Sequence, residues 1–478
     1  LDNSTFIDRS TNAHTITTTN TPIQTAFHPY LDNWSVEFGG TSDGVEFGDH
    51  SMGSGDWTIE AWVNTSVNKT HSVFDFRPAG QNGLYPAISL INNQFSYYVN
   101  STTVLTGTTT LNVGQWHHFA LVKNSGTTTL YVDGTSEDSF SDSTTYATGR
   151  IRMASGAFSG SPRFDGYMSN FRVVVGTALY TANFTPPTEK LTAVTNTIVL
   201  SAQSNRFIDN SSSPNTATAI GSPIISTYNP FGQLSEYAVG ENKGSVDLIA
   251  ATSYVTSDTN ISLGSGDFTV EFWHYLTART GGTSTSTHPA LFNNYTSFGA
   301  GAIAFYAGHG SSTITQYQLA LDGSFPAVNA GTVEYNTWVH TAIVRSSGTV
   351  TCYINGQSIG TRVENAEIDG NGTKIYIGTG GNNLTNDNIT GYISDFSWVA
   401  GTAKYTSAFT PPTSPVGNTN ASLYLPFDNA GIFDKTSNTD IDFINTNITT
   451  STTQTKYADT AIYFPSGSNN ALTVKYAD

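Results

Sequence analysis

The sequence predicts an all-β chain built as a tandem array of antiparallel β-sandwiches, two of them complete and one partial. Three observations predict this architecture. Long stretches of the sequence occur twice, which is typical of repeated folding units. Short runs of alternating apolar residues are separated by Gly- and Asn-rich turn signals, which favours strands joined by tight connections. No stretch has convincing helical periodicity.

The duplication covers most of the chain and keeps aromatic, Gly and Pro residues in register. The corresponding strings are "GSGDWTIEAWVN" from Gly53 and "GSGDFTVEFWHY" from Gly264, "WHHFALVKNSGTTTLYVDG" from Trp116 and "WVHTAIVRSSGTVTCYING" from Trp338, "GTALYTANFTPPT" from Gly176 and "GTAKYTSAFTPPT" from Gly401, and "FIDRSTNAHTI" from Phe6 and "FIDNSSSPNTATAI" from Phe207. Such agreement over separate segments indicates two copies of one module.

The positions of the copies predict the domain boundaries. We expect a sandwich over residues 1–188, a linker over 189–197, a second sandwich over 198–413, a linker over 414–421 and a partial third repeat over 422–478. The third repeat stops before its "GSGDF" segment, and so few strands cannot bury a face of their own. We expect either that the sequence is a portion of a longer protein, or that these last strands pack on the second sandwich or complete a sheet in another subunit by strand addition.

Within each copy, the pattern assigns roles to individual segments. "WTIEAWV" and "FTVEFWH" are apolar on both alternating faces, so we expect central strands covered from two sides. "HFALVKNSGTTTLYVDG" reads as a hairpin. The Val run before Gly176 is expected to be the last strand of the sandwich. Tyr180 and Phe184 should then pin the departing chain, which Pro186-Pro187 keeps extended, so the repeated string is interpreted as a connector.

Composition excludes several classes of function. Only 12% of the 478 residues are charged, the net charge is −17 and Lys and Arg form no cluster, which argues against nucleic acid or anionic membranes as partners. No apolar run is long enough to insert into a membrane. Cys352 is the only cysteine, so no intrachain disulfide forms, and its counterpart Leu130 predicts a small core side chain.

The strings "GSGDFTVEFW", "W-x-H-x-A-x-V…G-T-x-x-x-Y-x-[DN]-G" and "G-Y-[IM]-S-[ND]-F" resemble laminin-G-like domains of the concanavalin A-like lectin/glucanase superfamily. The resemblance implies a concanavalin A-like/laminin G-like jelly roll of two curved antiparallel sheets. The "GTA-x-Y-T-x-x-FTPPT" and "NRFIDNSS" strings are similar to tandem repeats of this family in structural proteins of marine phages. Because one fold hosts many functions, the resemblance defines the architecture more closely than the activity.

Glu60 and Glu271 are the residues that most resemble a catalytic site. Jelly-roll glycosidases of this superfamily place two carboxylates two and four residues apart on one strand, and both side chains then face one cleft. Here Trp62 and Asn64 follow Glu60, and the second copy likewise has no carboxylate at these spacings. We therefore expect each Glu to be hydrogen-bonded within its sheet, and we predict no catalytic residues and no enzymatic activity.

Two further sets of polar residues have simple structural interpretations. His117 and His118 are adjacent on a strand and so point to opposite faces, which argues against a metal pair. Only His118 has a counterpart, His340, and we expect both to be satisfied core histidines. Asp56 and Asp267, in the two "GSGD" strings, are expected to stabilise turns.

Two ligand-binding possibilities stay open. Calcium is the one candidate cofactor, since the loops at Gly381–Thr390 and Leu90–Phe95 offer oxygen ligands, although Asn is equally a turn former and no ligand is assigned. Tyr85, Tyr97 and Tyr98 could stack on sugar rings. The alternative is that one of the adjacent tyrosines packs inward while the other covers a sheet.

These observations lead to one functional expectation and one alternative. We expect a non-enzymatic structural or adhesive component of a virion or extracellular assembly, of the phage fibre or capsid-decoration type, located at the virion surface or outside the cell. Its partners would be other copies or subunits of the assembly and cell-surface glycans. The alternative is an array of carbohydrate-binding modules in a bacterial surface adhesin or a secreted enzyme.

Overall fold

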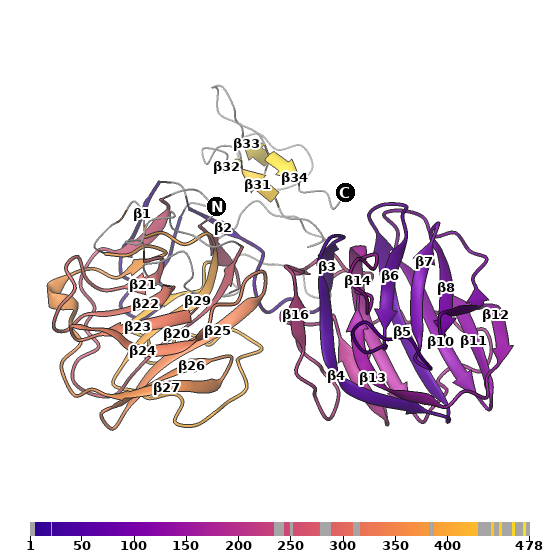
Figure 1. Ribbon diagram of the computed structural model, residues 1–478. Helices are drawn as coiled ribbons and strands as arrows, with labels where there is room; N and C mark the ends of the chain where they lie inside the picture. The colour runs from indigo at the N-terminus through magenta and orange to yellow at the C-terminus, as the bar shows by residue number, and fades with distance from the viewer. Residues whose placement is uncertain are drawn as a thin grey trace. The chain divides into compact units, whose positions relative to one another are not determined.

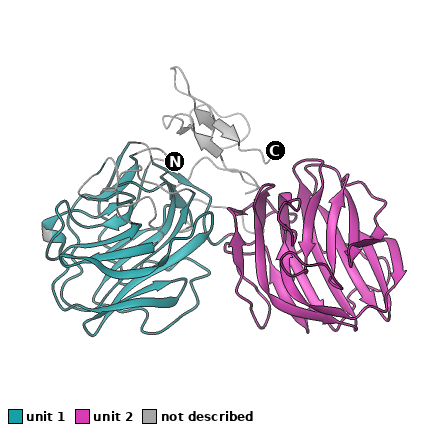
Figure 2. Ribbon diagram, viewed as in Figure 1, with its two compact units in different colours: residues 1–30, 236–475 teal, residues 31–235, 476–478 magenta. Residues whose placement is uncertain are grey.

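The computed structural model describes residues 5–20, 22–233, 243–248, 252–277, 288–308, 316–381, 384 and 387–428, together with the backbone of four short strands after them (Figure 1). The chain divides into two compact units, drawn in different colours in Figure 2. Leu31–Ser235 form one unit, called the first sandwich below. Leu1–Tyr30 and Glu236–Lys475 form the other, called the second sandwich.

The first sandwich consists of an eight-stranded and a seven-stranded sheet, both antiparallel. The eight-stranded sheet has the order β12-β11-β10-β5-β14-β3-β17, with β15 also paired to β14. Its strands are β3 (Ser35–Gly39), β5 (Trp57–Thr65), β10 (His117–Asn124), β11 (Thr127–Val132), β12 (Thr135–Ser141), β14 (Asp165–Val175), β15 (Thr197–Ser201) and β17 (Ile224–Ser226). The seven-stranded sheet has the order β16-β4-β13-β6-β7-β8-β9. Its strands are β4 (Gly44–Gly53), β6 (His71–Asp75), β7 (Ala87–Ile91), β8 (Gln94–Val99), β9 (Thr102–Thr106), β13 (Tyr146–Met153) and β16 (Thr218–Ile220).

The second sandwich repeats this topology. Its eight-stranded sheet has the order β2-β18-β29-β20-β25-β26-β27, with β30 also paired to β29, and its seven-stranded sheet has the order β1-β19-β28-β21-β22-β23-β24. The strands of the first are β2 (Ile23–Thr25), β18 (Ser245–Asp247), β20 (Phe268–Leu276), β25 (Trp338–Ser346), β26 (Thr349–Ile354), β27 (Gln357–Val363), β29 (Gly391–Ala400) and β30 (Leu423–Leu425). Those of the second are β1 (Ile16–Thr19), β19 (Tyr254–Ser257), β21 (Ala290–Asn293), β22 (Ile303–Ala307), β23 (Gln316–Leu321), β24 (Ser324–Thr332) and β28 (Tyr376–Ile377). The 3₁₀ turn η1 (Gly370–Gly372) is the one helical element of the described residues.

Each sandwich has a core of aromatic and branched side chains between its two sheets. In the first, Phe119 of β10 stacks with Phe74 of β6 and contacts Phe95 of β8, and all three side chains are fully buried. In the second, Phe272 of β20 stacks with Phe396 of β29 inside one continuous hydrophobic cluster. The prediction of tandem antiparallel jelly-roll sandwiches is therefore confirmed.

The predicted central strands and hairpins are also confirmed. Every residue of β20 is buried, and in β5 only Trp62 is partly exposed, because both faces of these strands are covered. β10 and β11 pair as a hairpin from Asn124↔Thr127 onward. Asp56 Oδ1 accepts a 2.8 Å hydrogen bond from Ser125 N in its turn, and Asp267 Oδ1 does the same for Ser347 N, so both aspartates stabilise turns as predicted.

The folding units differ from the units of the sequence repeat. We expected a linker at 189–197 and the second sandwich from 198, but β15, β16 and β17 pair with β14, β4 and β3 of the first sandwich. The Val run of β14 is therefore not the last strand of its sandwich. The second sandwich in turn takes β1 and β2 from the N-terminal residues and β30 from the expected third repeat. A repeat shows the period of the chain but not the point at which one folded body ends.

The expected third repeat has two parts in the structure. Residues 422–428 pack on the second sandwich of their own chain, where Ser422 N and Trp398 O are 2.8 Å apart. Among the strands described after them, β31 (Ile441–Phe443) pairs with β34 (Leu472–Val474), and β32 (Thr449–Ser451) pairs with β33 (Ala461–Tyr463). The other residues of 429–478 lie outside the described residues, and strand addition to another subunit stays a prediction. Within the described part of the chain, no helix has the length and apolar character needed to cross a bilayer.

Candidate functional site

Glu60 lies on the face of β5 that points away from the core, yet its side chain is fully buried. Arg172 of β14 donates to Glu60 Oε1 through Nε at 2.9 Å and through a second guanidinium nitrogen at 2.6 Å. His118 Nε2 donates to Oε2 at 3.2 Å. The hydroxyl of Tyr180, from the connector, donates to the same oxygen at 2.8 Å. Burial raises the pKa of Glu60, but the hydrogen bond from His118 and the charge of Arg172 outweigh it, so the pKa lies below its ordinary value.

The second sandwich repeats this cluster with one exchange. Lys404 Nζ donates to Glu271 Oε1 at 2.5 Å and takes the place of the arginine, while the Tyr405 hydroxyl donates to Oε2 at 2.7 Å. His340 Nε2 lies 3.6 Å from Oε2. Burial raises the pKa of Glu271, and His340 together with the charge of Lys404 brings it down to about 2. Both carboxylates therefore stay ionised, and both oxygen atoms of each accept hydrogen bonds.

The connector closes this face in both copies. Tyr180 and Phe184 stack with ring centroids 3.7 Å apart, and Tyr405 and Phe409 repeat the pair at 3.6 Å. In the first copy this pair packs against Ala120 and neighbouring buried residues of the sheet. The prediction that Tyr180 and Phe184 pin this segment is confirmed, but the segment leads into β15 of the same sandwich, so it does not connect one sandwich to the next. Glu60 is hydrogen-bonded within the sheet by His118 and Arg172, as predicted. Glu271 accepts its hydrogen bonds from Lys404 and Tyr405 of the connector instead, and both glutamates are buried.

The histidines and the cysteine have the expected structural roles. His117 Nδ1 pairs with Asp133 Oδ2 at 2.7 Å, whereas His118 points to Glu60, so the neighbours do not converge. Cys352 is fully buried, and burial raises the pKa of its thiol to about 12. Over the described residues, no group of three or more His, Cys, Asp or Glu side chains is arranged to hold a metal ion.

The loops considered for calcium are only partly described. Asn93 sits in the β7–β8 turn with a positive φ of 57°, and its Nδ2 donates to Leu111 O at 3.2 Å, which is the behaviour of a turn former. In the loop Gly381–Thr390, residues 382, 383, 385 and 386 lie outside the described residues. Calcium binding at that loop stays a prediction.

The three tyrosines proposed as a sugar platform separate in the structure. Tyr97 is fully buried and its hydroxyl donates to the hydroxyl of Tyr146 at 2.8 Å. Tyr98, the next residue of β8, lies half-buried on the opposite, outer face. Tyr85 is also half-buried and packs against Gly149 of β13. The alternation of Tyr97 and Tyr98 was the alternative that the sequence left open, and it leaves Tyr98 as the surface aromatic of this strand.

Tyr98 ends a row of side chains that crosses five strands of the seven-stranded sheet. Directly opposed residues of neighbouring strands share one face, and the register joins Glu46, Arg152, Asp75, Ala87 and Tyr98 in this order. We call these five residues the outer row. It combines an aromatic ring, a small residue beside it and a line of planar charged groups.

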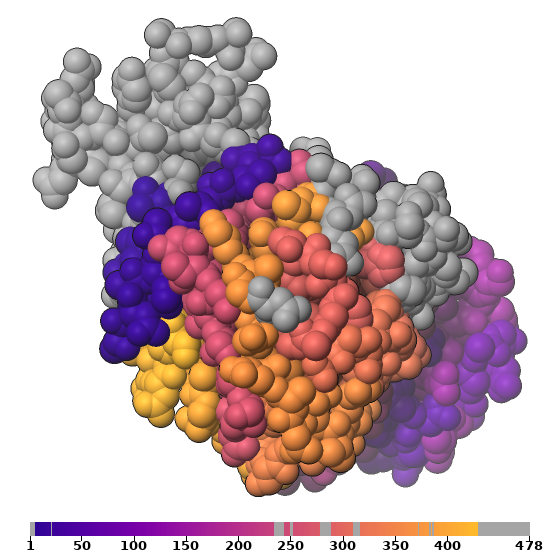
Figure 3. Space-filling view, turned by 90° about the vertical axis from the view of Figure 1, so that its left-hand side faces the viewer, coloured from indigo at the N-terminus to yellow at the C-terminus, as the bar shows by residue number. Residues whose placement is uncertain are grey.

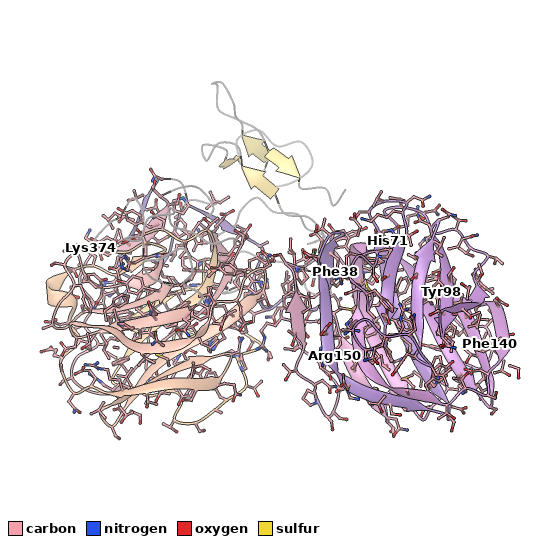
Figure 4. All side chains as sticks on the ribbon, viewed as in Figure 1. Phe38, His71, Tyr98, Phe140, Arg150 and Lys374 are labelled. Atoms are coloured by element: carbon pink, nitrogen blue, oxygen red, sulfur yellow. The ribbon has the colours of Figure 1, made fainter. Side chains whose placement is uncertain are left out.

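The charged half of the outer row is held rigidly by its own ion pairs. Arg152 Nε donates to Glu46 Oε1 at 2.6 Å, and Asp75 accepts from Arg77 at 2.6 and 2.9 Å. Arg150 Nε lies 3.2 Å from Asp49 Oδ1 at the edge of the row, and its side chain is 47% exposed. Figure 4 labels Arg150 and Tyr98, which are both carried by strands of the first sandwich. The exposed Arg150 guanidinium can hydrogen-bond a polyhydroxylated ligand, while the buried Arg152 and Asp75 hold the row in place.

The corresponding face of the second sandwich is covered by the protein itself. Its floor consists of buried alanines, on which aromatic side chains pack: Ala290, Ala302, Ala304, Ala320, Tyr295, Tyr306, Phe298 and Phe325. The register places Ala304 of β22 opposite Ala320 of β23 and Asn293 of β21. In the first sandwich the same face carries the outer row, in which Asp75, Ala87 and Arg152 are buried and Glu46 and Tyr98 are partly exposed, so the two copies differ at this position.

The charged half of the outer row was not predicted from the sequence. One signal was present, because "GRIRM" alternates two arginines around an apolar residue and so places Arg150 and Arg152 on one face. Glu46 and Asp75 come from strands that are not neighbours in sequence. Only the register of the sheet brings them to Arg152.

The family model agrees with this architecture. A family model described as the concanavalin A-like lectin/glucanases superfamily matches residues 38–179 and 250–404. Among curated proteins, none matches the sequence. The fold is similar to a heptameric SAP-like pentraxin from Limulus polyphemus, which is 14% identical, with 41% of this chain and 94% of that chain covered and a TM-score of 0.33.

Two further solved structures show the same kind of similarity. Domains LG4-5 of the mouse laminin alpha1 chain are 10% identical, with 83% of this chain and 96% of that chain covered and a TM-score of 0.27. A putative carbohydrate binding protein from Bacteroides ovatus ATCC 8483 is 12% identical, with 43% and 62% covered and a TM-score of 0.31.

Proposed function

Because the chain belongs to the concanavalin A-like lectin/glucanases superfamily, we propose that it is a non-enzymatic glycan-binding protein whose binding surface is the outer row of the first sandwich. One observation carries the proposal: Tyr98, half-buried on the outer face of the seven-stranded sheet, lies in register with Asp75, Arg152 and Glu46, with the exposed Arg150 at the edge of the row. An aromatic face packs on the apolar side of a sugar ring, and charged groups form hydrogen bonds with the hydroxyls of the ring.

The buried glutamates support the non-enzymatic part of the proposal. Glycoside hydrolysis by a retaining or inverting mechanism needs two carboxyl groups that reach the scissile bond. Glu60 and Glu271 are each 0% exposed, and each is surrounded by donors that keep it ionised. A carboxylate held below its ordinary pKa is a poor general acid.

The setting that we propose is a structural or adhesive component of a virion surface or another extracellular assembly, which contacts host glycans through the first sandwich. The tandem array of sandwiches supports it, since a string of such modules forms an extended structural body. The alternative is a carbohydrate-binding array of a bacterial adhesin or a secreted enzyme. Mass spectrometry of purified virions against secreted fractions of the source distinguishes these settings.

A glycan array probed with the full chain tests the binding proposal. We expect saturable binding that Tyr98→Ala weakens by at least about tenfold, the effect of losing about 1.4 kcal/mol of contact energy. Tyr376→Ala is the matched control, because Tyr376 is a half-buried tyrosine in the seven-stranded sheet of the second sandwich. Binding that Tyr376→Ala abolishes and Tyr98→Ala leaves unchanged would contradict the proposal.

A further inference from the structure

Each sandwich is completed by a separate segment that we call a head: residues 6–30 are the first head and residues 207–231 the second. The second head fills a slot on the first sandwich. Asp209 Oδ1 accepts from Leu200 N at 2.8 Å and from Ser211 N at 2.9 Å, and its Oδ2 accepts from Asn215 N at 2.8 Å. β16 and β17 of this head then extend both sheets.

The first head fills the matching slot on the second sandwich with the same bonds. Asp8 Oδ1 accepts from Tyr424 N at 3.0 Å and from Ser10 N at 2.8 Å, and its Oδ2 accepts from His14 N at 2.8 Å. β1 and β2 of this head pair with β19 and β18. Figure 3 shows the indigo N-terminal residues against the orange strands of this sandwich and beside the yellow residues that precede 429. The slot is therefore the same structure in both copies.

The aromatic ends of the two heads dock in nearly identical geometry. Tyr228 lies 5.5 Å from Trp116 at 37°, and Phe27 lies 5.1 Å from Trp338 at 37°. The next aromatic of each head meets a tryptophan edge to face: Phe231 with Trp62 at 5.9 Å and 85°, and Tyr30 with Trp273 at 6.2 Å and 85°. A head thus contributes strands, a buried aspartate and two ring contacts to its slot.

The two slots differ in how the head is connected to the rest of the chain. The second head follows the strands that it completes, and the chain then continues into the second sandwich. The first head fills its slot from the far end of the chain, as the ion pair between Arg9 and Asp428 at 3.1 Å demonstrates, and continues through residues 31–33 into the first sandwich. In both cases, a head held in one sandwich leads directly into another sandwich.

We propose that the slot of the second sandwich is an assembly site, which takes the first head of a second copy of this chain. In that arrangement, the chain entering from the slot continues into the first sandwich of the incoming copy. The junction between two chains then repeats the junction inside one chain. A head-to-tail contact of this kind leaves one free head and one free slot at the ends, so it propagates into a linear array or closes into a ring. Strand addition supplies main-chain hydrogen bonds, and the aspartate and the rings supply specificity.

Insertion of the first head into the slot of its own chain competes with insertion into the slot of another chain. A head tethered to its own chain has a high effective concentration, but only where the linkers let both ends meet without strain. Closure within one chain requires the first head to meet a slot from which the whole first sandwich separates it in sequence. Assembly between chains does not carry this requirement. A second competitor is present in the sequence, since "IFDKTSN" at Ile432–Asn438 repeats the start of a head.

Two chains with one new cysteine each test the proposal. Thr25 of the first head lies directly opposite Ser245 of the slot in the β2–β18 ladder, with their hydroxyl oxygens 3.5 Å apart. Cysteines at directly opposed antiparallel positions are close enough for a disulfide. A Thr25→Cys chain and a Ser245→Cys chain are produced together with different affinity tags, oxidised and examined for a disulfide-linked heterodimer. The native Cys352 is fully buried and does not interfere.

The first sandwich provides a matched control pair. Ser226 of the second head lies opposite Ser35 of its slot in the same way, but head and slot belong to one continuous unit. We expect the Thr25→Cys and Ser245→Cys pair to yield at least about tenfold more heterodimer than the Ser226→Cys and Ser35→Cys pair. A chain that carries both Thr25→Cys and Ser245→Cys should form a ladder of covalent multimers. The proposal is overturned if this double variant forms only intrachain disulfides at every concentration. It is also overturned if the cysteine at position 245 forms no disulfide with the cysteine at position 25 of its own chain or of another chain.

Discussion

The hydroxyl of Tyr180 donates a hydrogen bond of 2.8 Å to Glu60 Oε2, and this contact ties the connector to the outer face of the first sandwich. Tyr405 and Glu271 repeat it at 2.7 Å in the second. Burial, and then the charge of the facing glutamate, raise the pKa of both tyrosines, so each remains a neutral donor. The repeated string therefore caps a buried carboxylate.

Removing one of these hydroxyls should destabilise the sandwich to which it belongs. We expect Tyr180→Phe to lower the free energy of unfolding of the first sandwich by about 1–3 kcal/mol, because a buried charge loses a donor that nothing replaces. Hydrogen exchange measured peptide by peptide across a urea series assigns the loss to one sandwich. Tyr98→Phe is the control, since this hydroxyl lies on the outer face. Equal effects of the two variants would show that the bond to Glu60 is not stabilising.

The low pKa of Glu271 predicts a specific pH dependence. Its folded-state value of about 2 lies below the ordinary 4.5, so the carboxylate stabilises the fold at neutral pH, and this contribution is lost as the pH falls from about 4.5 towards 2. We expect the stability difference between the wild type and Glu271→Gln to be large at pH 7 and to narrow through that window. Glu367→Gln, at an exposed glutamate of the same sandwich, is the control. A stability difference between the wild type and Glu271→Gln that stays constant down to pH 2 would contradict the low pKa of Glu271.

Gly134 allows the connector to approach the sheet. Phe184 N donates to Gly134 O at 2.9 Å, and a Cβ on Gly134 would lie 1.9 Å from Phe184 O. We expect Gly134→Ala to cost about 3 kcal/mol of stability, through this clash and the positive φ of 78°. Gly126→Ala has a similar φ of 81° but meets nothing within 4 Å, and should cost about 1 kcal/mol. Urea unfolding compares the two, and equal losses would mean that only backbone strain matters.

Local pattern predicted the strands, the hairpins and the turn aspartates, because these features depend on neighbours in sequence. The absence of a second carboxylate near Glu60 predicted its structural role for the same reason. Its partners Arg172 and Tyr180 were not predicted, since they come from β14 and from the connector, which folds back over the sheet. A contact across more than a hundred residues leaves no local signal.

The heads show a different limit of sequence analysis. The repeat assigned "FIDNSS" to the start of the second copy, but Asp209 binds Leu200 N in the first sandwich. A sequence repeat does not show where one folded unit ends and the next begins. That boundary depends on which strand edges pair with the segment. The candidate ligand surface has the same origin, because the register of the sheet alone brings Asp75 next to Arg152.

A crystal structure of the full chain with a glycan identified on the array tests the central claim most directly. We predict a sugar ring stacked on Tyr98, with hydroxyls within hydrogen-bond distance of the Arg150 guanidinium or the charged groups of the outer row. The corresponding face of the second sandwich, covered by Tyr306 and its neighbours, should hold no ligand. A glycan bound away from Tyr98, at a loop rim or on the second sandwich, would contradict the account.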